Sequence, residues 1–282
     1  MKAELLVSAQ ELAANVANPE WVVFDVRHDL GDVNRGRREY HAGHIPGAYF
    51  LHLDEDLSGE KTGTNGRHPL PDVAKLAAKL SQCGVAPGRR VVAYDDAGGS
   101  VAGRLWWLLR WLGHARVSLL DGGIPAWRRE GLPVEAAVPP PRAGQFEPRP
   151  MLGATTDIHY VAAFRGSPTV RIVDARGAER FSGAAETIDP VGGHIPGAVN
   201  RFWKQNLDDD GRFKPPAQLK QEFLSLLGEA TPALTVHQCG SGVTACHNLF
   251  AMELAGLGGS RLYPGSWSEW CADPLRPVAK GP

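Results

Sequence analysis

The sequence predicts an α/β protein with two tandem domains, each a parallel sheet with helices on both faces. Its 282 residues exceed the roughly 100–200 residues of one ordinary domain. Segments of the first half recur in the second half, and within each half short β-branched runs alternate with longer helical patterns. Such alternation is typical of a parallel sheet covered on both faces.

An internal repeat is visible in pairs of matching segments. They keep the same order in both halves and are offset by 143 to 150 positions, so a duplication explains them better than chance. The pairs are WVVFDVR (21–27) with VRIVDAR (170–176), GHIPGA (43–48) with GHIPGA (193–198), and VSLLDGGIPAW (117–127) with SRLYPGSWSEW (260–270).

The boundary between the copies is expected in a proline-rich stretch. Residues 133–152 hold six prolines, which remove backbone donors and restrict φ, so this stretch is expected to be an extended, semi-rigid connection. We therefore predict a first domain at 1–138, a linker at 139–152 and a second domain at 153–282.

Hydrophobic periodicity places the main elements of each domain. In the first domain we expect strands at 21–26, 91–95 and 117–120 and helices at 72–82 and 100–113. In the second domain we expect strands at 171–175, 233–237 and 260–263 and helices at 217–229 and 242–258.

Composition excludes some classes of partner. Lys and Arg number 30 against 31 Asp and Glu, so no net field favours nucleic acid or an anionic membrane. Residues 1–20 lack the apolar core of a signal peptide, and no segment is long enough to span a bilayer. We therefore expect a cytoplasmic protein, and its four widely spaced cysteines are expected to be reduced.

Cys239 is the strongest candidate for chemistry. It follows the strand expected at 233–237, and ligands of parallel sheets bind beyond the carboxyl ends of strands. Glycines let the next N–H groups turn inward at a helix N-terminus, where a cysteine is more readily ionised. We expect Cys239 to be a nucleophile; a buried structural cysteine is the alternative. The anion-binding loop would consist of Gly240, Ser241, Gly242, Val243 and Thr244. At an offset of 143, Cys239 aligns with Asp96, so only the second domain would be catalytic.

Two rival chemistries use similar residues. Cysteine-dependent phosphatases need an arginine six positions after the nucleophile, where this chain has Ala245. Zinc could use a Cys2His2 set, but the spacing is not that of a zinc knuckle, so no metal is expected. That set consists of His237, Cys239, Cys246 and His247.

Over nearly its whole length the chain resembles the tandem-domain rhodanese family of sulfurtransferases. The resemblance is carried by both GHIPGA segments, by DVR and DAR after the first strands, by RFSG at 180–183 and by CGSGVT at 239–244. The last motif is similar to the loop of 3-mercaptopyruvate sulfurtransferases. Thiosulfate-using relatives carry basic side chains where this chain has Gly240 and Ser241.

The resemblance implies two rhodanese-like domains and a ping-pong reaction without a cofactor. Cys239 would take a sulfane sulfur from 3-mercaptopyruvate and pass it to a thiol, such as thioredoxin or a low-molecular-weight thiol, or to cyanide. Thiosulfate is the alternative donor, because it would use the same fold and nucleophile. A binding-only carrier role would be favoured if neither copy held the nucleophile.

The resemblance also assigns Arg180 to the donor, because it matches the family's substrate arginine and a guanidinium binds carboxylate by two parallel hydrogen bonds. An ion pair with Glu179 or Glu186 is the structural alternative. No arginine lies between Arg180 and His194, where similar family members have a second one, so the donor stays open.

His44, in the first GHIPGA segment, matches a histidine proposed as a proton relay in relatives. Its duplicate His194 makes a shared structural role at least as good an explanation. Cys83 and Cys271 lie in no comparable loop and are expected to be inert.

Overall fold

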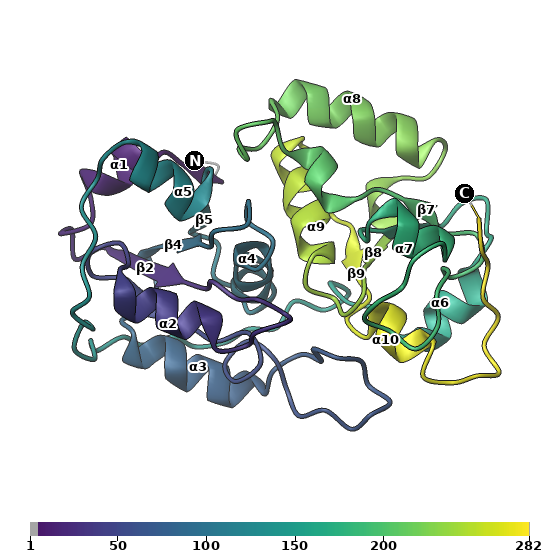
Figure 1. Cartoon of the computed structure of the whole chain (residues 1–282), viewed down its shortest axis with the longest axis horizontal. Coiled ribbons are helices and arrows are strands. Elements are labelled where there is room, and N and C mark those ends of the chain that lie inside the picture. Colours follow the sequence, from purple (N-terminus) through teal and green to yellow (C-terminus); the bar gives the residue numbers. More distant parts are fainter. Residues whose placement is uncertain (1–4, 282) are drawn as a thin grey trace. The chain divides into compact units, whose positions relative to one another are not determined.

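A computed structural model describes residues 5–281, which fold into two units (Figure 1). The first unit holds the described residues up to Gly59, together with Pro71–Met151 and Asp209–Arg212. The second holds Glu60–Leu70, Leu152–Asp208 and the residues from Phe213 on. Residues 60–70 thus pack with the second unit although they lie far before it in the sequence.

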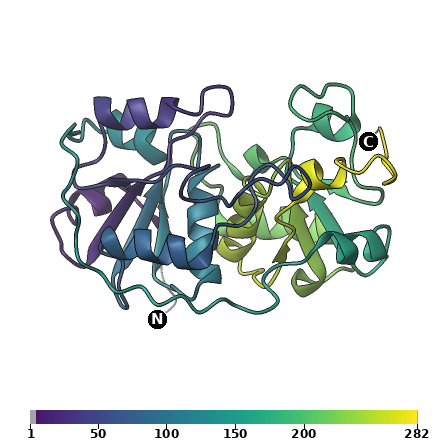
Figure 2. The same ribbon diagram turned by 90° about the horizontal axis from the view of Figure 1, so that it is seen from below.

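The first unit is built on a five-stranded parallel sheet in the order β1-β5-β4-β2-β3. Its strands are β1 (Leu6–Val7), β2 (Trp21–Asp25), β3 (Tyr49–Phe50), β4 (Arg90–Tyr94) and β5 (Val117–Leu120). Its helices are α1 (Ala9–Ala13), α2 (Arg35–Ala42), α3 (Val73–Gln82), α4 (Ala102–Trp111) and α5 (Gly123–Arg129). Helices lie on both faces of this sheet (Figure 2).

The second unit has a four-stranded parallel sheet in the order β7-β6-β8-β9. Its strands are β6 (Arg171–Asp174), β7 (Val199–Asn200), β8 (Thr235–Gln238) and β9 (Arg261–Leu262). Its helices are α6 (Ile158–Phe164), α7 (Ala178–Ser182), α8 (Pro216–Leu227), α9 (Ala245–Leu254) and α10 (Ser266–Trp270), with 3-10 turns at Trp203–Asn206 and Pro232–Leu234.

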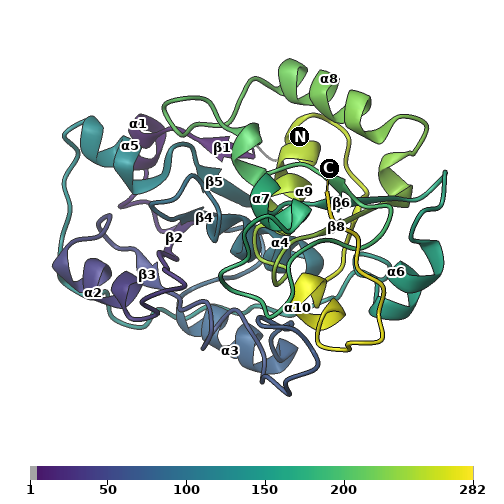
Figure 3. The ribbon, with the colours of Figure 1, turned by 45° about the vertical axis from the view of Figure 1, so that its right-hand side comes forward.

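The core of the second unit shows which helices cover which face. Side chains of α6, α7 and α10 share one buried cluster with Ile172 of β6 and Val236 of β8. On the other face His237 of β8 contacts Met252 of α9. In Figure 3, α8 and α10 accordingly lie on opposite sides of β6 and β8.

The structure confirms the predicted fold class, and each predicted strand and helix is present with slightly different ends. The helix expected from 72 begins at Val73, because the Asp72 carboxylate caps it by accepting from the Lys75 N–H. The helix expected from 242 begins at Ala245, because the preceding residues form a separate loop. The two-residue strands β1, β3 and β7 were not predicted, since a period of two needs more residues to be recognised.

Strand register corrects the equivalence proposed for Cys239. Asp25 and Asp174 hold the same place in the repeat, and they pair with Tyr94 and Gln238. The residue after Tyr94 is therefore the counterpart of Cys239. That residue is Asp95 rather than Asp96, because the offset between the copies changes slightly along the chain.

The proline-rich stretch at 139–152 contains no helix or strand and lies along the first unit up to Met151. The Arg142 N–H donates to the carbonyl of Gln82 at 2.9 Å, and the Arg149 N–H donates to the carbonyl of Leu112 at 2.9 Å. These bonds attach the stretch to the ends of α3 and α4. Within residues 5–281, no helix has both the length and the apolar character needed to cross a membrane.

Candidate active site

Cys239 lies at the carboxyl end of β8, and a loop of six residues, 239–244, connects this strand to α9. The Cys239 N–H donates to Ser266 Oγ at 3.1 Å, and its carbonyl accepts from the Trp267 N–H at 3.0 Å. Only 2% of the Cys239 surface is exposed. Residues at the start of α10 therefore fix the position of the Cys239 backbone.

The backbone of the loop turns toward the Cys239 sulfur. The Ser241 N–H donates to Sγ at 3.4 Å. Gly242 has a φ of +75°, and a Cβ there would lie 2.4 Å from the carbonyl oxygen of Pro264. No larger residue fits that position without moving backbone, so the glycine is required for the loop to curl around the sulfur.

In the first unit, the equivalent loop after β4 holds a side-chain carboxylate, that of Asp95. The Asp95 carboxylate accepts hydrogen bonds from the N–H groups of Ala97, Gly99, Val101 and Ala102, at 2.8 to 2.9 Å. Burial raises the pKa of Asp95, while these hydrogen bonds favour its ionised form. Asp95 thus shows what this loop shape binds: a negative group at the end of a strand, facing inward-pointing N–H groups.

The other cysteines have different surroundings. Burial raises the pKa values of Cys83 and Cys271 to about 11, so both stay protonated at neutral pH. The buried Cys246 thiol donates to the carbonyl of Gly242 at 3.3 Å. Only Cys239 combines a strand end with a loop of N–H groups, and all four cysteines are free thiols.

Arg180, on α7, reaches the same loop. Its Nε donates to both oxygens of Glu186, at 2.9 and 3.0 Å, and its Nη2 donates to Asp189 at 2.8 Å. Its two Nη atoms lie 3.5 and 3.6 Å from the position of a Cβ on Gly240. Arg180 therefore makes the ion pair with Glu186 that was the structural alternative, and it also faces the cysteine loop.

Glu186 is an anchor for that arginine. Burial opposes its ionisation, but hydrogen bonds from Arg180 and from the N–H groups of Asp189 and Ile188 hold the pKa of Glu186 below its usual value. A second arginine, Arg176, also approaches Glu186, at 3.5 Å. The carboxylate stays charged and fixes the orientation of the guanidinium beside it.

The sequence analysis missed two residues beside the loop, Arg67 and His68. His68 Nδ1 and Ser241 Oγ share a hydrogen bond of 2.7 Å. Arg67 Nη1 pairs with Asp189, and its backbone N–H donates to Ser268 Oγ at 2.9 Å. Their segment has no periodic pattern, so a basic dipeptide between glycine and proline is the only signal in the sequence.

His44 lies in the first unit, in the same environment that His194 has in the second. His44 Nδ1 is 2.7 Å from the carbonyl oxygen of Tyr40 and its ring stacks on Tyr40, with centroids 3.9 Å apart. His194 Nδ1 is 2.9 Å from the carbonyl oxygen of Phe181 and stacks on that ring at 3.8 Å. This repetition favours the structural role for both histidines.

The side chains considered for zinc have other partners. Burial lowers the pKa of His237 to about 3, and its Nε2 lies 3.0 Å from Met252 Sδ. His247 stacks on Phe213 with centroids 4.7 Å apart. Within residues 5–281, neither histidine joins a cluster of ligand atoms with Cys239.

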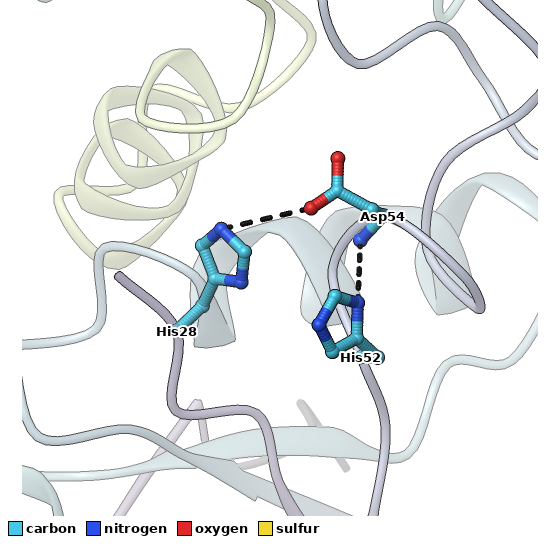
Figure 4. A group of neighbouring side chains, drawn as sticks. All are labelled: His28, His52 and Asp54. Atoms are coloured by element: carbon cyan, nitrogen blue, oxygen red, sulfur yellow. Dashed lines mark hydrogen bonds and ion pairs between the residues drawn. The ribbon is translucent and has the colours of Figure 1, made fainter. Parts of the chain in front are cut away.

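A different cluster, formed by His28, His52 and Asp54, brings ligand-type atoms within 4.8 Å of one another (Figure 4). His52 Nδ1 is 3.2 Å from the Asp54 N–H, and its Nε2 is 2.8 Å from the carbonyl oxygen of Val33. His28 Nε2 is 3.9 Å from an Asp54 carboxylate oxygen. Because both nitrogens of His52 already have backbone partners, this arrangement is best explained as closing the turn at 52–55.

The chain is similar to known proteins over most or all of its length. The family profile described as "Rhodanese-like domain" matches residues 8–130 and 157–273. A probable 3-mercaptopyruvate sulfurtransferase of Pseudomonas aeruginosa is 48% identical, with both chains covered fully. A putative thiosulfate sulfurtransferase of Mycobacterium tuberculosis is 39% identical over 99% of this chain and 98% of its own. The solved 3-mercaptopyruvate sulfurtransferase from Leishmania major superposes with a TM-score of 0.83 at 30% identity, covering 95% of this chain and 74% of its own.

Proposed function

The chain belongs to the rhodanese family, with two rhodanese-like domains in tandem, and on this premise we propose that it is a 3-mercaptopyruvate sulfurtransferase acting through a Cys239 persulfide. The observation that carries the proposal is the loop at 239–244, in which the Cys239 sulfur accepts from the Ser241 N–H just before the start of α9. The first unit has Asp95 in that place, so the second unit is assigned the chemistry.

The reaction begins when the Cys239 thiolate attacks the sulfur of 3-mercaptopyruvate. The new S–S bond forms as the C–S bond breaks, and the electron pair of that bond goes to the carbon, giving the enolate of pyruvate. The proton of the donor's S–H passes to the enolate, and the outer sulfur of the persulfide is left with the negative charge. The hydrogen-bonded pair of His68 and Ser241 lies beside Cys239 and is suited to move this proton.

The loop stabilises the persulfide by the same contacts that Asp95 receives in the first unit. Counted from the strand end, the N–H groups that bind Asp95 correspond to those of Ser241, Val243, Ala245 and Cys246. Those of Ser241, Val243 and Ala245 would face the outer sulfur, whereas the Cys246 N–H already donates to the carbonyl of Val243 at 3.0 Å. A helix N-terminus favours the negative charge of that sulfur. An acceptor thiolate or cyanide then attacks that sulfur, and Cys239 leaves as the thiolate.

Gly240 favours 3-mercaptopyruvate over thiosulfate as donor. A Cβ at this position would lie 2.9 Å from Arg67 Nη2, so a lysine or arginine side chain there would displace the Arg67 guanidinium. The loop therefore relies on neutral side chains, while its cations come from neighbouring segments. Thiosulfate is the second candidate, because a relative is named for it and its anionic oxygens could use the same guanidinium groups.

We further propose that the acceptor is a thiol, such as thioredoxin or a low-molecular-weight thiol, or cyanide. The outer sulfur of a persulfide reacts with any of these nucleophiles. The four free thiols fit a reducing compartment, and the cytoplasm is the location proposed.

The test compares Cys239→Ser with Cys271→Ser, which removes another buried thiol. Each protein is incubated with 3-mercaptopyruvate or thiosulfate, the gain of one sulfur atom is followed by mass spectrometry, and kcat/KM is measured with dithiothreitol and with cyanide. We expect Cys271→Ser to behave as wild type and Cys239→Ser to show neither the mass gain nor turnover. The wild type should prefer 3-mercaptopyruvate by about tenfold or more.

Each other result has a definite meaning. Full transfer by Cys239→Ser would refute the persulfide mechanism. A preference for thiosulfate would keep the persulfide and overturn the donor. Activity with neither donor would favour the carrier role.

A further inference from the structure

We propose that Asn206 and Asn248 are positioning residues for sulfur transfer. They hold the first turn of α9 against the rest of the second unit, and with it the loop whose N–H groups face the sulfur on Cys239. This role rests on the proposed function and adds to it two residues outside the cysteine loop. Both side chains are completely buried, although each carries a polar carboxamide.

The start of α9 lacks the attachment that most helices have there. A helix is usually fixed at its first residue by a side chain that accepts from N–H groups of the first turn. In the described part of the chain, the Thr244 side chain at this position makes no such bond. The N–H of Ala245, the first helical residue, is instead among those expected to face the outer sulfur. The first turn must therefore be fixed by contacts from its side.

Asn248, the fourth residue of α9, supplies these contacts. Its Nδ2 donates to the carbonyl of Arg201 at 2.9 Å, and its Oδ1 accepts from Asn206 Nδ2 at 2.7 Å. Asn206 Nδ2 also lies 3.2 Å from Nδ1 of His247, the residue before Asn248. Two neighbouring residues of the first turn are thus bonded to the chain at 201–206.

That chain is itself anchored to the sheet and to α8. Asn206 Oδ1 accepts from Arg201 Nε at 3.2 Å and from Arg201 Nη2 at 3.0 Å. The Arg201 backbone N–H donates to the carbonyl of Asp174, at the end of β6, and its Nη2 donates to Glu222 of α8 at 2.5 Å. Partial burial opposes the ionisation of Glu222, but hydrogen bonds, first that from Arg201, hold its pKa below the ordinary value. The carboxylate therefore stays charged and keeps the guanidinium in place.

Hydrogen bonds fix a helix more precisely than apolar packing does. Apolar contacts are non-directional and permit small shifts of the helix, whereas hydrogen bonds weaken steeply when their distance or angle changes. Sulfur transfer depends on such precision, since a displacement of about 1 Å can cost about a hundredfold in rate. The need to hold the cysteine loop therefore explains two buried polar side chains, His247 and Asn248, in one helical turn.

The first unit attaches its equivalent helix at the same place. At the offset that strand register gives for the cysteine loop, Arg104 of α4 is the counterpart of Asn248. Arg104 Nη2 lies 3.4 Å from the carbonyl oxygen of Leu57, in the segment after the edge strand β3. In the second unit the corresponding attachment, after the edge strand β7, is a buried chain of carboxamide and guanidinium groups.

The test compares Asn248→Ala with Leu249→Ala, which removes a buried apolar side chain from the next position of α9. Turnover is expressed per active site, counted by mass spectrometry as the protein that gains one sulfur atom from 3-mercaptopyruvate, so unfolded protein does not contribute. Asn248→Ala should lower kcat by about tenfold or more, because the loop shifts relative to the sulfur. Its KM for 3-mercaptopyruvate should stay unchanged, since Arg180 lies on α7. Leu249→Ala should keep the wild-type kcat, although urea denaturation should show that it is destabilised.

A double-mutant cycle shows whether Asn206 acts through Asn248. Asn206→Ala removes the same bond from the other side, so it should lower kcat by a similar factor, and the double variant should lose no more than the larger single loss. Arg201→Met keeps the carbonyl that binds Asn248 and should lower kcat less; if Asn248→Ala fails to fold, Asn206→Ala and Arg201→Met give the same readout.

Three results would overturn the inference. One is an unchanged kcat in the variants of both asparagines. The second is a loss of kcat in Leu249→Ala as large as that in Asn248→Ala, which would show a merely structural role. The third is a double variant whose loss equals the product of the two single losses, because independent effects multiply.

The proposed function can fail separately. If the wild type turned over thiosulfate alone, the donor would be wrong, and the same losses of kcat measured with thiosulfate would still support the positioning role. If 3-mercaptopyruvate were turned over by all variants at the wild-type rate, the function would stand and the positioning role would be refuted.

Discussion

Substituting alanine for Gly242 tests whether the cysteine loop is held by its backbone. Gly242 has a φ of +75°, a conformation that costs a residue with a Cβ about 1–2 kcal/mol. The added methyl group would also lie 2.4 Å from the carbonyl oxygen of Pro264, so backbone must shift, at a further cost of about 1–3 kcal/mol. Gly242→Ala should therefore destabilise the protein by about 2–5 kcal/mol.

Gly166→Ala is a matched control in the same unit. Gly166 has a φ of +74° and no atom within 4 Å of its Cβ position, so it measures the conformational cost alone. Urea denaturation of both variants, followed in the transition of the second unit, isolates the contact with Pro264 as the difference between them. Gly242→Ala should also lower kcat by about tenfold or more, because the N–H groups of the displaced loop no longer face the Cys239 sulfur. Equal destabilisation by the two substitutions, with unchanged kcat, would refute this account of the loop.

Two other predictions concern the site and its strand. Gly240→Ala adds a methyl group 2.9 Å from Arg67 Nη2, which is the flexible end of a side chain. KM for 3-mercaptopyruvate should therefore rise severalfold, while the midpoint of urea denaturation stays unchanged. An unchanged KM would contradict the placement of Arg67. Burial lowers the pKa of His237 to about 3 from an ordinary value of 6.5, so the unfolded chain takes up this proton first as pH falls. The contribution of neutral His237 to the free energy of unfolding should therefore be complete above pH 6.5 and decrease below it by about 1.4 kcal/mol per pH unit. His237→Gln should reduce this slope in denaturation experiments at about pH 5 and pH 7.

The local pattern of the sequence determined the fold class, the longer elements and the position of Cys239. Strand and helix periodicities depend on residues near one another in the chain, so the run before Cys239 and the glycines after it were sufficient to place a nucleophile between a strand and a helix. The repeat was equally visible, because both copies keep GHIPGA and an aspartate with an arginine after the first strand. Asp174 and Arg176 do pair with each other in the structure, as Asp25 and Arg27 do.

Only the tertiary structure decided which side chains surround Cys239. Arg67 meets Asp189 across 122 positions, and His68 meets Ser241 across 173 positions; neither contact leaves a periodic signal. The equivalence of Asp95 with Cys239 likewise needed strand register, since a one-residue change in offset cannot be seen in a short motif. A sequence reports the preferences of neighbouring residues, whereas a site built from separate segments depends on how those segments pack, and packing is a property of the whole chain.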